Sequence, residues 1–217
     1  MKWKLVVFDL DGTLVNTIED LGAAVNHALQ SMGLPLHEIE AYKKMVGGGV
    51  RNLVWKALPE QYKDDEAMLN ETLAVFMEYY CAHICVHSQP YAGMRELLAE
   101  LNAAGVAIAV ASNKFQAGTE MLTAQLFPAV RFISIYGGRP GVPLKPDPAV
   151  ISTILAEAGV APEDAVMVGD SGTDTRTASA SGLSSIAVTW GFKPESAVAG
   201  AGYVADTCGQ LRSLLLG

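Results

Sequence analysis

Short apolar runs alternate with helical patterns along most of this 217-residue chain. Such runs are typical of strands buried on both faces of a parallel sheet, and the helical stretches are typical of the connections between them. The pattern therefore predicts an α/β fold with a Rossmann-like parallel sheet core and helices on both faces. We expect strands at residues 5–8, 106–111, 132–136, 165–168, 185–188 and near 203–204, and helices at 94–104 and 148–158.

The first predicted strand is not followed by the usual single helix and second strand. Instead, about 75 residues carry almost only helical signals. Thr17 with Asp20 resembles a capping box at the start of the first of these helices, and Gly33 is a typical stop signal. We predict further helices at about 50–58 and 66–84, a small helical cap domain at residues 15–88, and an α/β core domain formed by residues 1–14 and 89–217.

The composition limits the partners and the compartment. A formal net charge of -8 argues against nucleic acid and against an anionic membrane surface, since both are bound mainly through basic residues. Three cysteines give no disulfide framework and suit a reducing compartment. Asp9 interrupts any signal-peptide core, and no stretch is long and apolar enough to span a bilayer. We therefore expect a cytoplasmic protein, monomeric or homodimeric.

Polar residues follow four of the predicted strands or lie in the loops after them. These are the segments 9–13, 112–114, 145–148 and 169–174, which read Asp-Leu-Asp-Gly-Thr, Ser-Asn-Lys, Lys-Pro-Asp-Pro and Gly-Asp-Ser-Gly-Thr-Asp. Taken singly, each is an ordinary turn or helix-cap composition. Ligands of open parallel sheets, however, bind beyond the carboxyl ends of the strands, where all four segments are expected to meet.

Several carboxylates at one edge repel each other unless a cation balances them. Oxygen ligands in small number favour Mg²⁺, which also binds substrate phosphate. A carboxylate such as Asp9 can attack phosphorus and form an aspartyl-phosphate, and a second acid, Asp11, can act as general acid and base. The sequence thus predicts magnesium-dependent phosphoryl transfer.

These four segments resemble, in order, the motifs of the haloacid dehalogenase superfamily in its phosphatase branch. The resemblance implies Asp9 as the nucleophile and Asp11 as the general acid/base. It implies a magnesium site made of the Asp9 and Asp170 side chains and the Asp11 backbone carbonyl. It also implies Ser112 and Lys145 as the phosphate-binding pair, Asn113 as a further donor, Asp174 as a residue that orients Lys145 or a metal-bound water, and Ser171 as a supporting residue.

The acid at position 11 points to phosphate ester hydrolysis or mutase chemistry, because dehalogenases of the superfamily lack it. The segment 46–53, with three consecutive glycines, resembles the cap loop of phosphoglycolate phosphatases. That resemblance makes 2-phosphoglycolate the leading substrate, with Arg51 as a contact to its carboxylate and Lys114 as a further substrate contact. The ordinary alternative is a flexible turn and a surface arginine. Other candidate activities are a β-phosphoglucomutase-like phosphosugar mutase, or a phosphatase of sugar phosphates, nucleotides or pyrophosphate.

Two further hypotheses fit less well. Cys81, His83, Cys85 and His87 have ligand-type side chains, but on a helix the two cysteines and two histidines point to nearly opposite sides, so we expect buried thiols and a partly exposed histidine pair rather than zinc. A response-regulator receiver also combines strand-end acids, a hydroxyl and a lysine, but it is shorter and has no helical insertion.

Overall fold

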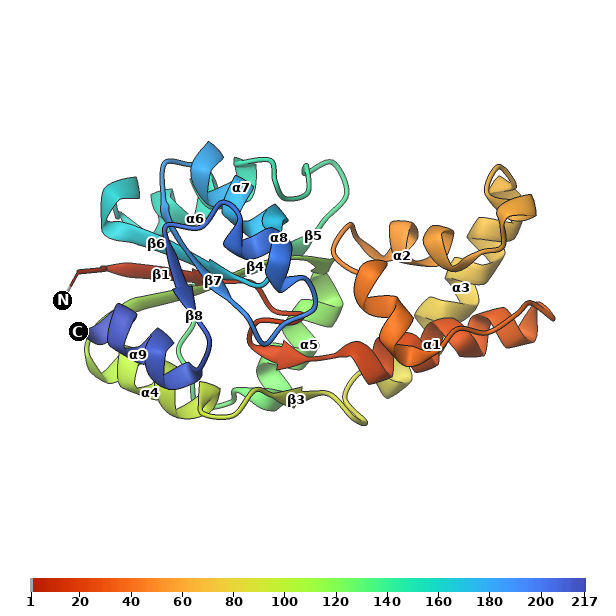
Figure 1. The fold of residues 1–217 in the computed structure, drawn as a ribbon, viewed down its shortest axis with the longest axis horizontal. Helices are drawn as coiled ribbons and strands as arrows, with labels where there is room; N and C mark the ends of the chain where they lie inside the picture. The colour runs from red at the N-terminus through yellow and green to blue at the C-terminus, as the bar shows by residue number, and fades with distance from the viewer. Residues whose placement is uncertain (1) are drawn as a thin grey trace.

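The computed structural model describes residues 2–217, which contain a six-stranded sheet in the order β5-β4-β1-β6-β7-β8. All neighbouring strands of this sheet are parallel. The predicted α/β fold is confirmed, and helices lie on both sides of the sheet (Figure 1). The strands are β1 Leu5–Phe8, β4 Ala107–Phe115, β5 Ser134–Gly138, β6 Ala165–Gly169, β7 Ser184–Val188 and β8 Tyr203–Ala205.

Alternating side chains of β1 divide the core into two clusters, as the two-residue period of a strand requires. Leu5 and Val7 belong to the cluster that contains residues of α6 (Ala149–Ala158) and α7 (Gly172–Ala180). Val6 and Phe8 belong to the cluster that includes α4 (Met94–Ala103), α5 (Gln116–Leu126) and α9 (Cys208–Leu216). A strand covered on both faces is apolar throughout, which explains the continuous run in the sequence.

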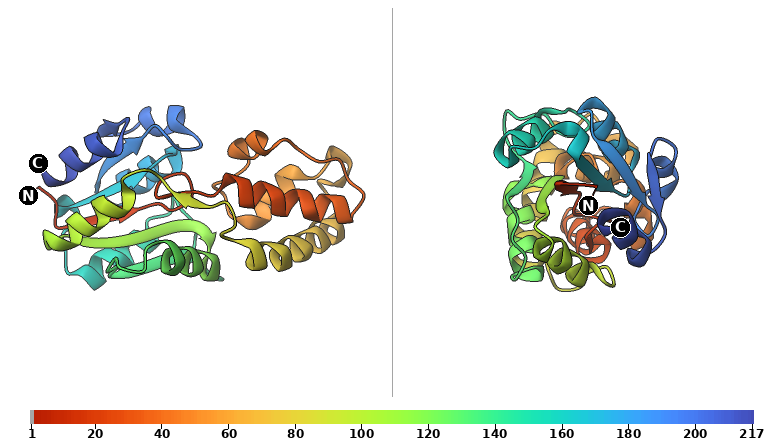
Figure 2. Two further views of the ribbon diagram at one scale, coloured as in Figure 1. Left: turned by 90° about the horizontal axis from the view of Figure 1, so that it is seen from below. Right: turned by 90° about the vertical axis from the view of Figure 1, so that its left-hand side faces the viewer.

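The helices between residues 18 and 83 gather at the end of the molecule opposite the chain termini (Figures 1 and 2). They are α1 Ile18–Ser31, α2 Val50–Ala57 and α3 Glu66–His83, with short 3₁₀ helices at Ile39–Lys44 and Glu60–Tyr62. We call residues 15–88 the helical region. Its two connections to the sheet, β2 (Val15–Asn16) and β3 (Gln89–Pro90), pair with each other as a short antiparallel ladder. None of the helices in residues 2–217 is both long and apolar enough to cross a membrane.

The start of α1 differs from the predicted capping box. Thr17 makes no capping hydrogen bond and instead donates to Asp11 at 2.8 Å. Asp20, which is buried, accepts the backbone N–H groups of His87 and Ser88 and the Ser88 hydroxyl at 2.6–3.1 Å. The prediction paired Asp20 with a neighbour in the sequence, whereas its oxygens accept from donors at the far end of the helical region, just before β3.

Strand β4 also extends beyond the predicted end at residue 111 and runs to Phe115. Its register with β5 shifts between Ala111 and Phe115. The polar triplet 112–114 therefore lies in the irregular end of a strand, with all three residues at most 7% exposed. A triplet whose composition is typical of a turn is therefore part of a buried site.

Candidate active site

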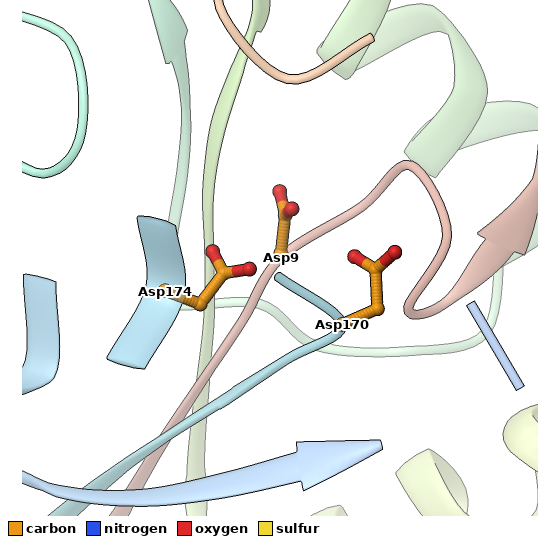
Figure 3. A group of neighbouring side chains, drawn as sticks. All are labelled: Asp9, Asp170 and Asp174. Atoms are coloured by element: carbon orange, nitrogen blue, oxygen red, sulfur yellow. The ribbon is translucent and has the colours of Figure 1, made fainter. Parts of the chain in front are cut away.

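Three carboxylates meet where the chain order of the sheet reverses around β1. Asp9 follows β1, Asp170 follows β6, and Asp174 lies in the first turn of α7. One oxygen from each lies within 4.8 Å of the others. Figure 3 shows the three side chains projecting toward a common space from these separate elements. The strand ends thus meet as the sequence predicted, at the position where open α/β sheets bind ligands.

Lys145 joins two of these acids. Its Nζ lies 3.1 Å from Asp9 Oδ1 and 2.7 Å from Asp174 Oδ1, and its side chain is 2% exposed. Burial alone lowers the pKa of this ammonium, but Asp174 and Asp9 outweigh burial and raise the pKa above its ordinary value. The two acids therefore favour the charged form of Lys145, which lies beside the predicted nucleophile.

Lys145 alone does not offset the cost of burying the charged forms of Asp9 and Asp170. Burial, with Asp174 and Asp9 nearby, raises the pKa of Asp170 to about 8. Burial, Asp174 and Asp11 raise the pKa of Asp9 to about 6, although Lys145 opposes this shift. A hard cation bound to these oxygen donors would stabilise their charged forms.

The backbone around Asp170 is fitted to this carboxylate. A Cβ on Gly12 would lie 2.4 Å from Asp170 Oδ2, and a Cβ on Gly191 would lie 2.2 Å from Asp170 Cβ. Phe192 N–H donates to Oδ2 at 2.6 Å, and the Thr13 hydroxyl donates to Oδ1 at 3.3 Å. The donor set and this close cradle fit a small divalent cation held by Asp9 and Asp170.

Asp174 is placed differently from the other two acids. Its Oδ1 accepts from Lys145, and its Oδ2 accepts the backbone N–H and hydroxyl of Ser171 at 3.1 and 2.7 Å. The pair forms a capping box at the start of α7. Asp174 therefore holds Lys145 in position, and Ser171 in turn fixes Asp174.

Asp11 lies between the sheet and the helical region. Its Oδ1 accepts from the Thr17 hydroxyl, and Lys114 Nζ lies 3.3 and 3.4 Å from its two oxygens. Lys114 also donates to the hydroxyl of Tyr80 on α3 at 2.6 Å. Burial lowers the pKa of Lys114, while Asp11 partly compensates. The second acid is therefore held by groups from both parts of the chain.

Ser112 and Asn113 lie beside this pair but have different surroundings. Ser112 Oγ accepts a 3.3 Å hydrogen bond from the backbone N–H of Lys114. The Asn113 amide donates to the carbonyls of Gly47 and Lys145 at 2.9 Å each, and its oxygen accepts the Lys145 N–H at 2.8 Å. Both amide hydrogens and the oxygen of Asn113 have these partners, so the side chain holds two loops together. The sequence analysis expected Asn113 to donate to the phosphate, but in this structure it has no free donor.

A pocket of about 600 Å³, part of it open to solvent, lies above these groups. Val46, Val50 and Leu53 from the helical region line its opposite wall. Nearly all of the predicted site residues line the pocket, namely Asp9, Asp11, Ser112, Asn113, Lys114, Lys145, Asp170, Ser171 and Asp174.

Arg51 is the predicted site residue that the structure leaves outside. It lies on α2 with its side chain 48% exposed, forms an ion pair with Glu66 and donates to Asn70 Oδ1 at 2.7 Å. On a helix, Arg51 and its neighbour Val50 point in different directions, and Val50 is the one that lines the pocket. The expectation that Arg51 contacts the substrate is revised on this ground.

The structure also adds a cation that the sequence analysis missed. Lys193 lines the pocket and donates to the Val46 carbonyl. Lys193 lies in the loop after β7, which ends at Val188. The search for polar residues after each predicted strand would have found it if that search had extended further along this loop.

The cysteines and histidines near the end of α3 do not gather as metal ligands. The helix ends at His83, before Cys85 and His87, and the two thiols are half-buried rather than buried. The His83 ring stacks on Tyr79 at a centroid distance of 4.0 Å. Within residues 2–217, the three aspartates are the group of such side chains found close enough to hold an ion.

Comparison with known proteins agrees with this geometry. The chain belongs to the haloacid dehalogenase-like hydrolases, whose family model matches residues 6–188. Phosphoglycolate phosphatase 1 of Pseudomonas aeruginosa is 38% identical over 192 residues, which cover 87% of this chain and 70% of that protein. Phosphoglycolate phosphatase of Chromobacterium violaceum is 32% identical over 214 residues, covering 98% and 96% of the two chains.

The fold is matched over its whole length by a solved structure. A candidate phosphoglycolate phosphatase from Lactobacillus delbrueckii subsp. bulgaricus superposes with a TM-score of 0.92 at 31% identity, with complete coverage of both chains. Within the hydrolase family, the chain is accordingly a phosphatase.

Proposed function

We propose that this phosphatase hydrolyses a small phosphorylated metabolite, with 2-phosphoglycolate as its preferred substrate, and that it requires Mg²⁺. The observation that carries the proposal is the placement of Asp9 in the lining of the pocket. Its Oδ1 is held by Lys145 and by the Leu10 N–H at 2.7 Å, whereas no hydrogen bond within residues 2–217 engages Oδ2. The names of the relatives support the choice of substrate.

The residues of the chain divide the reaction between them. Asp9 Oδ2 attacks phosphorus and forms an aspartyl-phosphate, while Lys145 and Ser112 bind the phosphoryl oxygens. Asp11 gives its proton to the leaving oxygen and later takes one from the water that hydrolyses the intermediate. Asp174 keeps Lys145 in place during both steps.

The acids of the site offer oxygen ligands suited to Mg²⁺. Asp9, Asp170 and the backbone carbonyl of Asp11 would hold it, and Mg²⁺ would supply charge neutralisation for the phosphoryl group. The raised pKa values of Asp9 and Asp170 support this assignment, because a cation at this position stabilises their charged forms.

The helical region, residues 15–88, is proposed to be a cap domain that covers the pocket and excludes water. Its apolar wall of Val46, Val50 and Leu53 supports this role, as does the ladder of β2 with β3 at the two connections. A cytoplasmic location is proposed on the chemistry of the cysteines, which are free.

The test is a hydrolysis assay of the purified protein with Mg²⁺ against 2-phosphoglycolate, sugar phosphates, nucleotides and pyrophosphate. We expect the highest kcat/KM for 2-phosphoglycolate, loss of activity with a chelator and recovery with added Mg²⁺. Isomerisation of a phosphosugar faster than phosphate release would contradict hydrolysis and indicate a mutase. Full activity in the chelator would contradict the metal assignment.

A further inference from the structure

Three lysines line the pocket, and their charges are balanced differently. Lys145 is paired with Asp9 and Asp174, and Lys114 is paired with Asp11. Lys193 has no carboxylate within ion-pair distance anywhere in residues 2–217. A half-buried ammonium that faces a ligand pocket without an anionic partner is costly unless a ligand supplies the anion.

The immediate surroundings of Lys193 increase this cost. Its hydrogen-bond acceptor is the neutral carbonyl of Val46. Burial and the nearby Lys56 lower the pKa of Lys193, and Asp170 only partly opposes them. An ammonium group has three donor hydrogens, and the Val46 carbonyl uses one of them, which leaves donors available for a ligand.

The loop beside Lys193 leaves room for such a ligand. Gly47 has a φ of +109°, and a Cβ placed on it would lie 3.5 Å from Lys193 Nζ. The glycine therefore lets the backbone pass close to the ammonium with no side chain between the ammonium and the loop. The pocket wall on this side is apolar, from Val46, Val50 and Leu53, so the helical region itself supplies no competing charged side chain there.

We propose that Lys193 is the residue that selects the substrate, by binding an anionic group, a carboxylate, at the end opposite the phosphate. This inference rests on the proposed function and assigns its substrate preference to a lysine of the sheet loops rather than to Arg51. The phosphate occupies Lys145 and Ser112 over Asp9, and the carboxylate of a short phosphorylated acid reaches the ammonium across the pocket. A charge-assisted hydrogen bond to this carboxylate would give Lys193 the anionic partner that residues 2–217 do not supply.

The experiment compares two substrates of similar size in the same protein sample. One is 2-phosphoglycolate, and the other is 2-hydroxyethyl phosphate, in which an alcohol replaces the carboxylate. The measured quantity is the ratio of their kcat/KM values. Because both assays use the same sample, a variant that is partly unfolded lowers both values equally and leaves the ratio unchanged.

Lys193→Met removes the charge and keeps the length of the side chain. It should lower the ratio by about 10- to 100-fold, the range expected for losing a hydrogen bond between charged groups. Lys193→Arg should restore most of the preference. The matched control is Lys56→Met, since Lys56 is also half-buried and donates at 3.4 Å to the adjacent Met45 carbonyl but does not line the pocket. Its ratio should stay within about twofold of the wild-type value.

The possible failures can be told apart. An unchanged ratio in Lys193→Met, with wild-type hydrolysis of 2-phosphoglycolate intact, overturns the role of Lys193 alone. An equal fall of the ratio in Lys56→Met also overturns it, because general positive charge then explains the preference. A wild-type protein that hydrolyses other esters but not 2-phosphoglycolate overturns the proposed substrate and this inference together.

Discussion

The strand-end edge and the helical region face each other across one pocket, but they contribute different kinds of groups. At the edge, acids and lysines are buried and bonded to each other, as in the contacts of Lys145 with Asp9 and Asp174. In the helical region, charged side chains pair at the surface, as Arg51 does with Glu66, and apolar side chains face the pocket. The comparison supports the proposal that the edge carries out the reaction and, through Lys193, selects the charge of the substrate, whereas the opposite apolar wall limits its shape.

The largest effect is expected from Asp9→Asn, which keeps the shape of the side chain and removes the nucleophile. We expect kcat to fall by on the order of 10⁴-fold or more, as for the loss of other covalent nucleophiles. The measurement is steady-state phosphate release, with circular dichroism to verify the fold. Substantial remaining turnover by a folded variant would show that Asp9 is not the attacking group.

Lys145→Met should affect both catalysis and stability. Losing one charge at the phosphate should lower kcat by about 10²- to 10³-fold. Breaking a buried ion pair should lower the free energy of unfolding by about 3–5 kcal/mol, measured by urea denaturation. The matched variant in the helical region is Lys43→Met, which breaks the surface pair with Glu40 and should cost less than about 1 kcal/mol. Similar losses for both variants would remove the distinction between buried and surface pairs.

Magnesium should stabilise the protein most at alkaline pH. The pKa of Asp170 in the folded protein, about 8, lies above its value of about 4 in an unfolded chain. Without metal, this group therefore stabilises the fold at low pH, and that contribution is lost as the pH rises through about 8. Mg²⁺ at 100 times its dissociation constant adds about 2.7 kcal/mol, or roughly 5–10 °C in Tm.

Thermal melts at pH 5.5 and pH 8.5, with chelator or with Mg²⁺, check this expectation. The increase in Tm on adding Mg²⁺ should be larger at pH 8.5, where protons no longer compete for the carboxylates. Asp170→Asn is the control and should lose most of the increase. An equal increase in this variant would contradict Asp170 as a ligand.

Asp20→Asn tests the contact that joins the two ends of the helical region next to the sheet. The charged acceptor of the His87 and Ser88 donors is lost, so stability should fall by about 1.5–3 kcal/mol. Glu19→Gln, next in the chain but 63% exposed, should change stability by less than about 0.5 kcal/mol. If chemical denaturation gave equal losses for both variants, the buried contacts of Asp20 would stabilise the fold no more than an exposed side chain does.

The smallest effect is expected for Arg51→Met. Its partners Glu66 and Asn70 are in the helical region, outside the pocket, so kcat/KM for 2-phosphoglycolate should change by less than about twofold. A fall of tenfold or more, confined to carboxylated substrates, would restore Arg51 as a substrate contact and would show that α2 moves during the reaction.

The sequence by itself determined the α/β fold, the positions of the main strands and the identity of the acids at their ends. These features are local: a fully buried strand requires a continuous apolar run, and the residues after such a run must lie at the carboxyl edge. For the same reason Asp9, Ser112, Lys145 and Asp170 could be brought together before any coordinates were known.

Only the tertiary structure decided which polar groups already have partners. Asn113 is bonded to Gly47 and Lys145, Asp20 is bonded to the chain near His87, and Lys193 faces the pocket without a carboxylate. Hydrogen bonds to Asn113 and Asp20 span up to 68 positions in the sequence, so no periodic pattern records them. The chemistry of this protein follows from what stands at the strand ends, and its selectivity follows from which of those charges the fold leaves unbalanced.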